Sequence, residues 1–237
     1  LLGTLHFPWW LTLPSLGIIS LSTYLSTMQT IIIQWTALGF IAWITIFFER
    51  RHHKNISKIY TKPNQSIIQV FLQGRWPLLW GAVALALLNM LTLFVAGHPW
   101  SVTFAFGLWG AKVATLLGVD VAHWEYWTWA YPSHALQNSI LNDSVSLTNI
   151  GLILGAFIAS SLAGKQNSKI NISIRSILAA IIGGIFMGYG ARLAFGCNIG
   201  ALFSGIASGS LHGWLWFGFA FFGSYFGVKL RPSFGLH

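Results

Sequence analysis

The chain has 237 residues, of which 55% are hydrophobic and 7% are charged, and its mean hydropathy is +0.66. These values exclude a soluble globular domain, whose surface requires about 25% charged residues. The formal net charge of +9 does not indicate a nucleic-acid partner, because the 13 lysines and arginines lie mainly in short patches between apolar runs. This is the positive-inside pattern of membrane proteins. We therefore expect an all-α polytopic integral membrane protein in a lipid bilayer.

Residues 1–75 predict an interfacial N-terminal segment, one spanning helix and a basic loop. Residues 1–28 are uncharged, contain two prolines and begin with several aromatic side chains, which favours an interfacial segment with a short helix after Pro14. Residues 29–48 are apolar and long enough to cross a bilayer. The basic loop that follows, up to Arg75, is expected in the cytoplasm.

Residues 76–237 form the second expected unit. The sequence predicts a span at 76–96, an apolar helix at 101–118 and a further span at 144–163. The loop at 119–143 contains three of the four acidic residues and no lysine or arginine. We therefore expect this loop on the outer face of the membrane.

After a second basic loop, the last part of the chain is again apolar. Residues 174–190 enter the membrane, 199–209 form a short piece rich in Gly and Ser, and 212–228 form the last predicted span. Lys229 and Arg231 then place the C-terminal end inside.

The charges of the loops constrain how many segments cross. Three apolar segments lie between the first and second basic loops, and three more lie between the second loop and the basic C-terminal end. A path that starts and ends inside needs an even number of crossings, so one segment of each set is expected to be re-entrant. The best candidates are 101–118 and 199–209, which leaves about five spanning helices. Transporters build polar sites where such discontinuous helices meet.

Function is expected in the stretch 183–214, because its glycines are too dense for an ordinary membrane helix. Arg192, in this stretch, and Lys112 are the two cations within apolar segments. A charge at that depth costs about 2.5–3.5 kcal/mol, so such residues face a cavity or a partner. No acidic residue lies in a span to pair with them, which favours an anionic ligand. The alternative is snorkelling to an interface, or a contact with carbonyls at a helix C-terminus.

Cys197, the one cysteine, directly precedes the short helix and lies near Arg192 in the sequence. A thiol in this positive potential can contact a soft anion without adding repulsion. The alternative is a small buried hydrophobic side chain. A single cysteine also excludes an internal disulfide and a cysteine-rich metal site.

The residues around Cys197 are further candidates. Asn198, Gly196 and Gly200 allow backbone amides to approach a ligand, although small-residue helix packing explains the glycines equally well. His98 and His212 each lie beside a break, and both also fit capping or interfacial roles. Because the sequence contains no Walker loop, G-x-S-x-G motif, dinucleotide fingerprint or HExxH motif, we expect no enzyme, no cofactor and no metal.

The run Gly184–Trp214, with MGYGARLAFGCNIG and SGSLHGW, resembles the C-terminal half of the YeeE/YedE sulfur-transport family. The run Gly97–Thr103, GHPWSVT, followed by Leu108–Lys112, LWGAK, is similar to the other signature of that half. The resemblance covers roughly residues 76–232, which we therefore predict to be a YeeE/YedE-like C-terminal transport unit. Thr103, within the second signature, joins the candidate residues.

The resemblance implies a multi-pass protein of the bacterial inner membrane, with pseudo-symmetric halves and a narrow path lined by cysteines. Cys197 matches the cysteine of the second half. The first-half cysteines of the family are absent, and residues 1–70 resemble only the tail of that half. The chain is then N-terminally truncated, completed by a separate polypeptide, or inactive alone. Expected partners are a thiosulfate-like anion, a missing N-terminal half and a small sulfur-carrier protein.

The function that these patterns favour is transport of thiosulfate or a related sulfur-containing anion. The substrate-binding residues that we predict are Cys197, Arg192, Asn198, Gly196, Gly200, Lys112, His212 and Thr103. Three alternatives stay open: a selenium-related transport protein, a membrane sulfurtransferase that forms a persulfide on Cys197, and a truncated inactive fragment.

Overall fold

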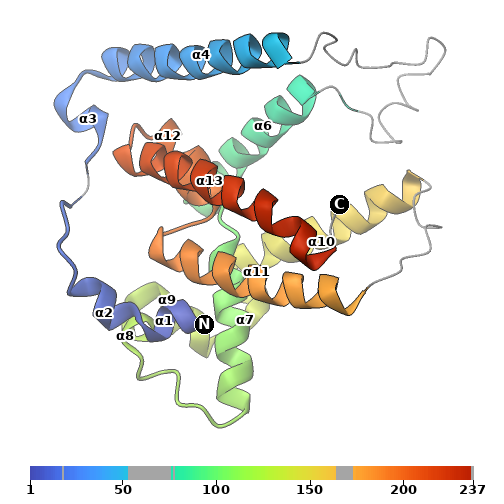
Figure 1. Ribbon diagram of the computed structural model, residues 1–237. Coiled ribbons are helices and arrows are strands. Elements are labelled where there is room, and N and C mark those ends of the chain that lie inside the picture. Colours follow the sequence, from blue (N-terminus) through green and yellow to red (C-terminus); the bar gives the residue numbers. More distant parts are fainter. Residues whose placement is uncertain (18, 53–75, 77, 164–172, 236–237) are drawn as a thin grey trace.

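The computed structural model describes residues 1–17, 19–52, 76, 78–163 and 173–235, and within these ranges every regular element is a helix (Figure 1). The basic loops predicted at 49–75 and around Lys165 lie largely outside the described residues. Four segments are long and apolar enough to cross a membrane. The prediction of an all-α polytopic membrane protein is confirmed.

The four candidate spans match four of the predicted ones. They are α4 (Thr27–His52), α6 (Leu78–Ala96), α10 (Ser144–Leu162) and the segment Ile174–Ala207, which begins with α11 (Ile174–Leu193). Helix α6 has no buried residue, as expected of a helix that faces lipid. Helix α13 (Leu211–Leu230) is a continuous helix of 20 residues. Its sequence contains several polar and glycine residues, and it is not among the four candidate spans. The fifth predicted span therefore stays a prediction.

The N-terminal segment is folded onto the rest of the chain. Helices α1 (Leu2–Leu5) and α2 (Phe7–Leu11) precede Pro14, and α3 (Leu21–Tyr24) follows it. Both α1 and α2 pack against α8 (Glu125–Thr128), and α1 also packs against α11. The N-terminus consequently lies beside α7 and α11 in Figure 1.

Helix α7 (Thr103–Leu116) is the first predicted half-membrane helix. Its 14 residues extend about 21 Å at 1.5 Å per residue, less than the roughly 30 Å of a hydrocarbon core. Ala105, Leu108, Ala111 and Ala114 are buried on one face, so small side chains let α9 (Ala130–Gln137) and α10 approach closely. This face belongs to the main apolar core, formed by Phe7, Leu108, Ala111, Ala114, Val121, Tyr126, Trp127 and Ala135.

The predicted outer loop at 119–143 contains short helices rather than irregular chain. They are α8, α9 and the 3₁₀ helix η1 (Ile140–Asn142). Side-chain caps stabilise the starts of η1 and α10. The Ser139 hydroxyl accepts a hydrogen bond from the Leu141 amide, and the Asp143 carboxylate accepts one from the Ser146 amide. The loop is therefore ordered, and it is anchored to α10.

Short helices also form where the second half-membrane helix is predicted. After α11 the chain turns and forms the π-helix η3 (Asn198–Phe203), then α12 (Ser204–Ala207), before α13 begins. These two short helices coincide with the predicted piece at 199–209. Figure 1 shows them next to the start of α13.

Candidate functional site

One cavity of about 1110 Å³ lies where the two half-membrane helices begin. It is lined by the start of α7, the last turns of α11, the break before η3 and one side of α13. Five of the eight predicted site residues line it: Thr103, Arg192, Gly196, Cys197 and Asn198. The structure therefore brings Thr103 together with residues that lie 89 to 95 positions later in the sequence.

The break itself is built by two unusual backbone positions. Phe195 has φ 52°, a left-handed conformation that is uncommon for a bulky residue. At Gly196 an added β-carbon would lie 2.9 Å from the Ala201 amide nitrogen, so only glycine fits. The tight turn ends α11 and lets η3 start within the cavity wall. A non-glycine residue held in this region signals stored strain, which proteins often place at functional sites.

Cys197 is the residue directly before η3. Its carbonyl accepts the Ala201 amide at 2.7 Å, and its half-buried thiol lines the cavity. Among the described residues no side chain hydrogen-bonds to this thiol. The positive end of the following helical turn contributes a favourable potential at this position.

Arg192 lies in the last turn of α11, within the same cavity wall. Its guanidinium carbon is 4.3 Å from the centroid of the Tyr126 ring. The buried Nε atom has no hydrogen-bond partner, and in the described part of the chain no carboxylate lies within ion-pair distance. The site thus contains a cation whose charge no carboxylate of the described residues neutralises.

Helix α7 contributes a second helix start to the cavity. Thr103 is its first residue, and Val102 and Thr103 both line the cavity wall. The buried Asn149 side chain of α10 donates to the Val102 carbonyl at 2.9 Å and so fixes this turn. Because helix N-termini carry partial positive charge, the two starts and Arg192 together favour an anion.

The other three predicted residues do not line the cavity. The Lys112 ammonium donates to the Leu136 and Asn138 carbonyls, at 2.8 and 2.6 Å, at the C-terminal end of α9. The His212 Nε2 donates to the Ala194 carbonyl at 2.6 Å, which holds the end of α11 to α13. A β-carbon added at Gly200 would lie 4.0 Å from the Trp100 carbonyl oxygen. Anion binding by these three residues stays a prediction.

His98 has a structural contact as well. Its Nδ1 donates to the Pro99 carbonyl at 3.0 Å, and its Nε2 accepts from the Ser144 hydroxyl at 2.9 Å. This pair fixes the turn before α7 to the start of α10. The arrangement matches the capping role that the sequence left open.

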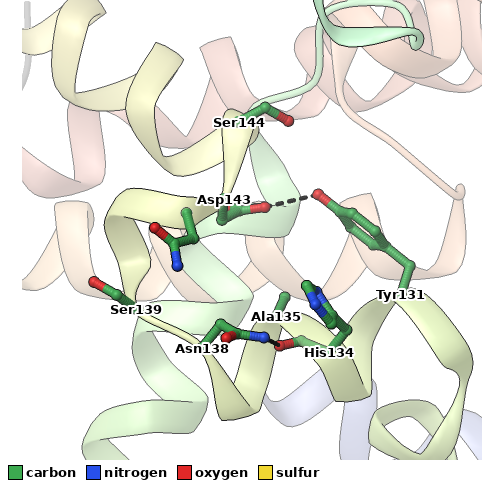
Figure 2. A pocket seen from close by; sticks show the side chains of 8 residues that line it. Tyr131, His134, Ala135, Asn138, Ser139, Asp143 and Ser144 are labelled. Carbon is green, nitrogen blue, oxygen red and sulfur yellow. Dashed lines mark hydrogen bonds between the residues drawn. The ribbon is translucent and has the colours of Figure 1, made fainter.

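A second, smaller cavity of about 100 Å³ lies in the outer segment (Figure 2). Tyr131 donates to one Asp143 oxygen at 2.7 Å, and the other oxygen accepts from the Ser146 hydroxyl at 2.6 Å. Burial raises the pKa of the Tyr131 hydroxyl above its usual value, and the bond to Asp143 raises it further. Since these polar groups satisfy one another, we assign the smaller cavity a structural role.

Several residues that shape the main site were not predicted. Tyr126 lies in the 119–143 loop, for which the sequence predicted only a position on the outer face, yet its ring faces the Arg192 guanidinium. Gln34 of α4 donates to the Ile206 carbonyl of α12 at 2.6 Å, and Ser20 pairs with Ser210 in an isolated antiparallel bridge. These contacts join positions more than 60 residues apart, and no local pattern in the sequence predicts them.

Comparison with known proteins agrees with the resemblance in the motifs. A family model described as sulphur transport matches residues 1–226, so the match begins well before residue 76. The chain is 34% identical over 161 residues to the probable transporter YedE of Escherichia coli, a match that covers 67% of this chain and 39% of that protein. Against YedE of Salmonella typhimurium the identity is 33% over 172 residues, covering 72% and 42%.

A thiosulfate transporter, TsuA of Spirochaeta thermophila, is 40% identical over 80 residues, or 34% of this chain and 24% of that protein. No solved structure matches. The chain spans about two fifths of the length of its YedE relatives. With a family match over nearly all of its residues, this multi-pass membrane chain belongs to the sulphur transport family.

Proposed function

We propose that this chain moves thiosulfate, or a related sulfur-containing anion, across a bacterial inner membrane. One observation carries the proposal: a cation, a thiol and two helix starts line the same cavity in an otherwise apolar protein. The names of the YedE and TsuA relatives support transport, and that of TsuA supports thiosulfate.

Three kinds of group bind the anion in the proposed site. Arg192 and the two helix starts offset the charge of the anion, whose burial without a partner would be prohibitively costly. The Cys197 sulfur contacts the terminal sulfur of thiosulfate, because both are soft and polarisable. Asn198 and the backbone at Gly196 supply polar contacts. A second transport half and a small sulfur-carrier protein stay predicted partners.

The proposal is tested by uptake of radiolabelled thiosulfate into cells that lack their own sulfate and thiosulfate uptake. Cys197→Ala should abolish uptake while the amount of protein in the membrane is unchanged. Ser208→Ala is the matched control, since Ser208 lies in the same segment but its side chain does not line the cavity. Equal uptake by the parent chain and by Cys197→Ala would exclude the thiol role.

The enzymatic alternative requires covalent chemistry at Cys197. Its thiolate would attack the outer sulfur of thiosulfate, the sulfur–sulfur bond would break, and sulfite would leave with the bonding electron pair. No base is hydrogen-bonded to the thiol among the described residues, and the His212 ring is occupied by the Ala194 carbonyl. This supports passage without covalent bonding. Mass spectrometry after exposure to thiosulfate should then show no added sulfur on Cys197.

A further inference from the structure

Arg192 lies in a slot between two short helices that are far from it in the sequence. On one side is Gly3 of α1, where an added β-carbon would lie 2.6 Å from the Arg192 Cβ and 2.8 Å from its Cγ. On the other side is the Tyr126 ring of α8, whose centroid is 4.3 Å from the guanidinium carbon. The glycine backbone thus confines the stem of the side chain, and the ring faces its charged head.

The ring that faces Arg192 is itself firmly held. Tyr126 is only 7% exposed, and its ring makes edge contacts with Phe7 at 5.3 Å and with Trp127 at 5.1 Å between centroids. The Trp127 indole donates to the Thr4 hydroxyl at 3.3 Å. These contacts join α1, α2 and α8 into one aromatic cluster, so the Tyr126 ring is a fixed surface for Arg192.

A cation–π contact with an arginine differs from an ion pair because it leaves the N–H donors of the guanidinium free. An aromatic face attracts the guanidinium through its quadrupole but uses none of the N–H donors, which lie in the guanidinium plane. A carboxylate partner would cancel the charge and occupy two donors. In the described part of the chain Arg192 has no such partner, and its buried Nε makes no hydrogen bond.

We infer that Tyr126 is the positioning residue of the anion site: its ring face holds the Arg192 guanidinium at the cavity and leaves the N–H donors for an oxyanion. The inference rests on the proposed function and deepens it. Because a planar guanidinium binds two oxygens side by side, the site selects an anion with a face of oxygens, such as the sulfonate end of thiosulfate, over a spherical halide.

The ring face carries this role, because the Arg192 guanidinium lies over it. Burial raises the pKa of the Tyr126 hydroxyl above its usual value, and the charge of Arg192 and its hydrogen bond to the hydroxyl only partly offset this effect. The hydroxyl therefore stays protonated near neutral pH and adds no negative charge to the site. Phenylalanine at this position should be able to replace tyrosine.

Kinetics of thiosulfate uptake by the full chain test the inference. Tyr126→Leu should raise KM about tenfold, with the maximal rate per molecule in the membrane within about twofold of the parent. Tyr126→Phe should restore the parent KM. Trp129→Leu is the matched control, because it removes a ring that contacts Phe7 in the same cluster but not Arg192. A parent-like KM in Tyr126→Leu, or a raised KM in Tyr126→Phe, would overturn the inference.

A second measurement reports on Arg192 without any transport. Phenylglyoxal modifies accessible guanidinium groups, and mass spectrometry of the solubilised full chain gives its rate at Arg192. The rate should rise severalfold in Tyr126→Leu and stay at the parent value in Tyr126→Phe. Tyr126→Met, which fills the volume without a ring, replaces the Leu variant if that variant is lost from the membrane. Equal rates in all variants would overturn the positioning role.

The two measurements separate this inference from the proposed function. If the parent chain takes up no thiosulfate but the modification rates follow the expected order, the proposed function fails and the positioning of Arg192 stands. If uptake depends on Cys197 but Tyr126→Leu behaves as the parent does in both measurements, the function stands and the positioning role fails.

Discussion

Two cations in apolar segments, Lys112 and Arg192, have opposite surroundings. The Lys112 ammonium donates to two carbonyls at the end of α9, at 2.8 and 2.6 Å, in a well-packed part of the fold. Arg192 faces an aromatic ring at 4.3 Å and lines a large cavity. Lys112 stabilises the contact between α7 and the end of α9. Arg192 lies at a cavity and has no carboxylate partner among the described residues.

The difference shows that a charge within an apolar segment does not by itself mark a binding site. A lysine places a compact charge, and the C-terminal carbonyls of a helix satisfy it well. The face of an arginine guanidinium can pack on an aromatic ring, which leaves the N–H donors at its edge for a ligand. The neighbouring residues decide between a structural and a binding role, and the two roles respond differently to substitution.

Loss of the cavity cation should have the largest effect. Arg192→Gln removes the charge opposite the anion, so thiosulfate uptake at low concentration should fall about 100-fold, as expected when a charged hydrogen bond worth about 2–3 kcal/mol is lost. Uptake assays at equal amounts of protein in the membrane measure this. If Arg192→Gln and Lys112→Met reduce uptake equally, the two cations do not differ in role.

Lys112→Met should instead affect stability. Two carbonyls at the end of α9 lose their charged donor, so the free energy of unfolding should fall by about 2 kcal/mol. The KM for thiosulfate should be unchanged. Thermal unfolding in detergent and uptake kinetics give the two values, and a raised KM with unchanged stability would place Lys112 in the binding path.

The packing that supports the break can be tested at Gly213. A β-carbon there would lie 2.6 Å from the Ile206 amide nitrogen, so Gly213→Ala should force α12 away from α13 and cost about 1.5 kcal/mol of stability. Gly218→Ala on the same helix is the control, because nothing lies within 4 Å of its β-carbon. Equal unfolding temperatures for the two variants would argue against the close packing.

The smallest effect is expected in the outer segment near Lys112. Tyr131→Phe leaves one Asp143 oxygen without its donor and should cost about 1 kcal/mol of stability. Because the pKa of the Tyr131 hydroxyl is raised in the folded state, its contribution is fully present below the unfolded pKa of about 10 and is lost only as the pH rises through the folded pKa. The difference in unfolding temperature should therefore be constant between pH 6 and pH 9.

Four spans and the short helices at 101–118 and 199–209 could be predicted because length, hydropathy and loop charge act locally along the chain. Residues 101–118 and 199–209 were assigned as short helices from segment length and the parity of crossings, and α7, η3 and α12 confirm that helices form there. Residues that share one motif, Arg192, Cys197 and Asn198, were found for the same reason.

The contacts that give each cation its role could not be predicted. The carbonyls that bind Lys112 lie at the end of α9, 24 and 26 residues away. The ring that faces Arg192 comes from the 119–143 loop, for which the sequence predicted only a position on the outer face. The helices of that loop were missed because they are short and because α8 and α9 have no side-chain cap; Ser139 caps only η1. Long-range packing carries no local periodicity.

Protection of Cys197 by thiosulfate tests the anion site most directly. Because the chain has one cysteine, the alkylation rate with N-ethylmaleimide reports on this position alone. Thiosulfate should slow alkylation severalfold, and chloride at equal ionic strength should not; the protection should disappear in Arg192→Gln and persist in Lys112→Met. An alkylation rate that thiosulfate leaves unchanged, or protection that survives in Arg192→Gln, would contradict an anion site at the break.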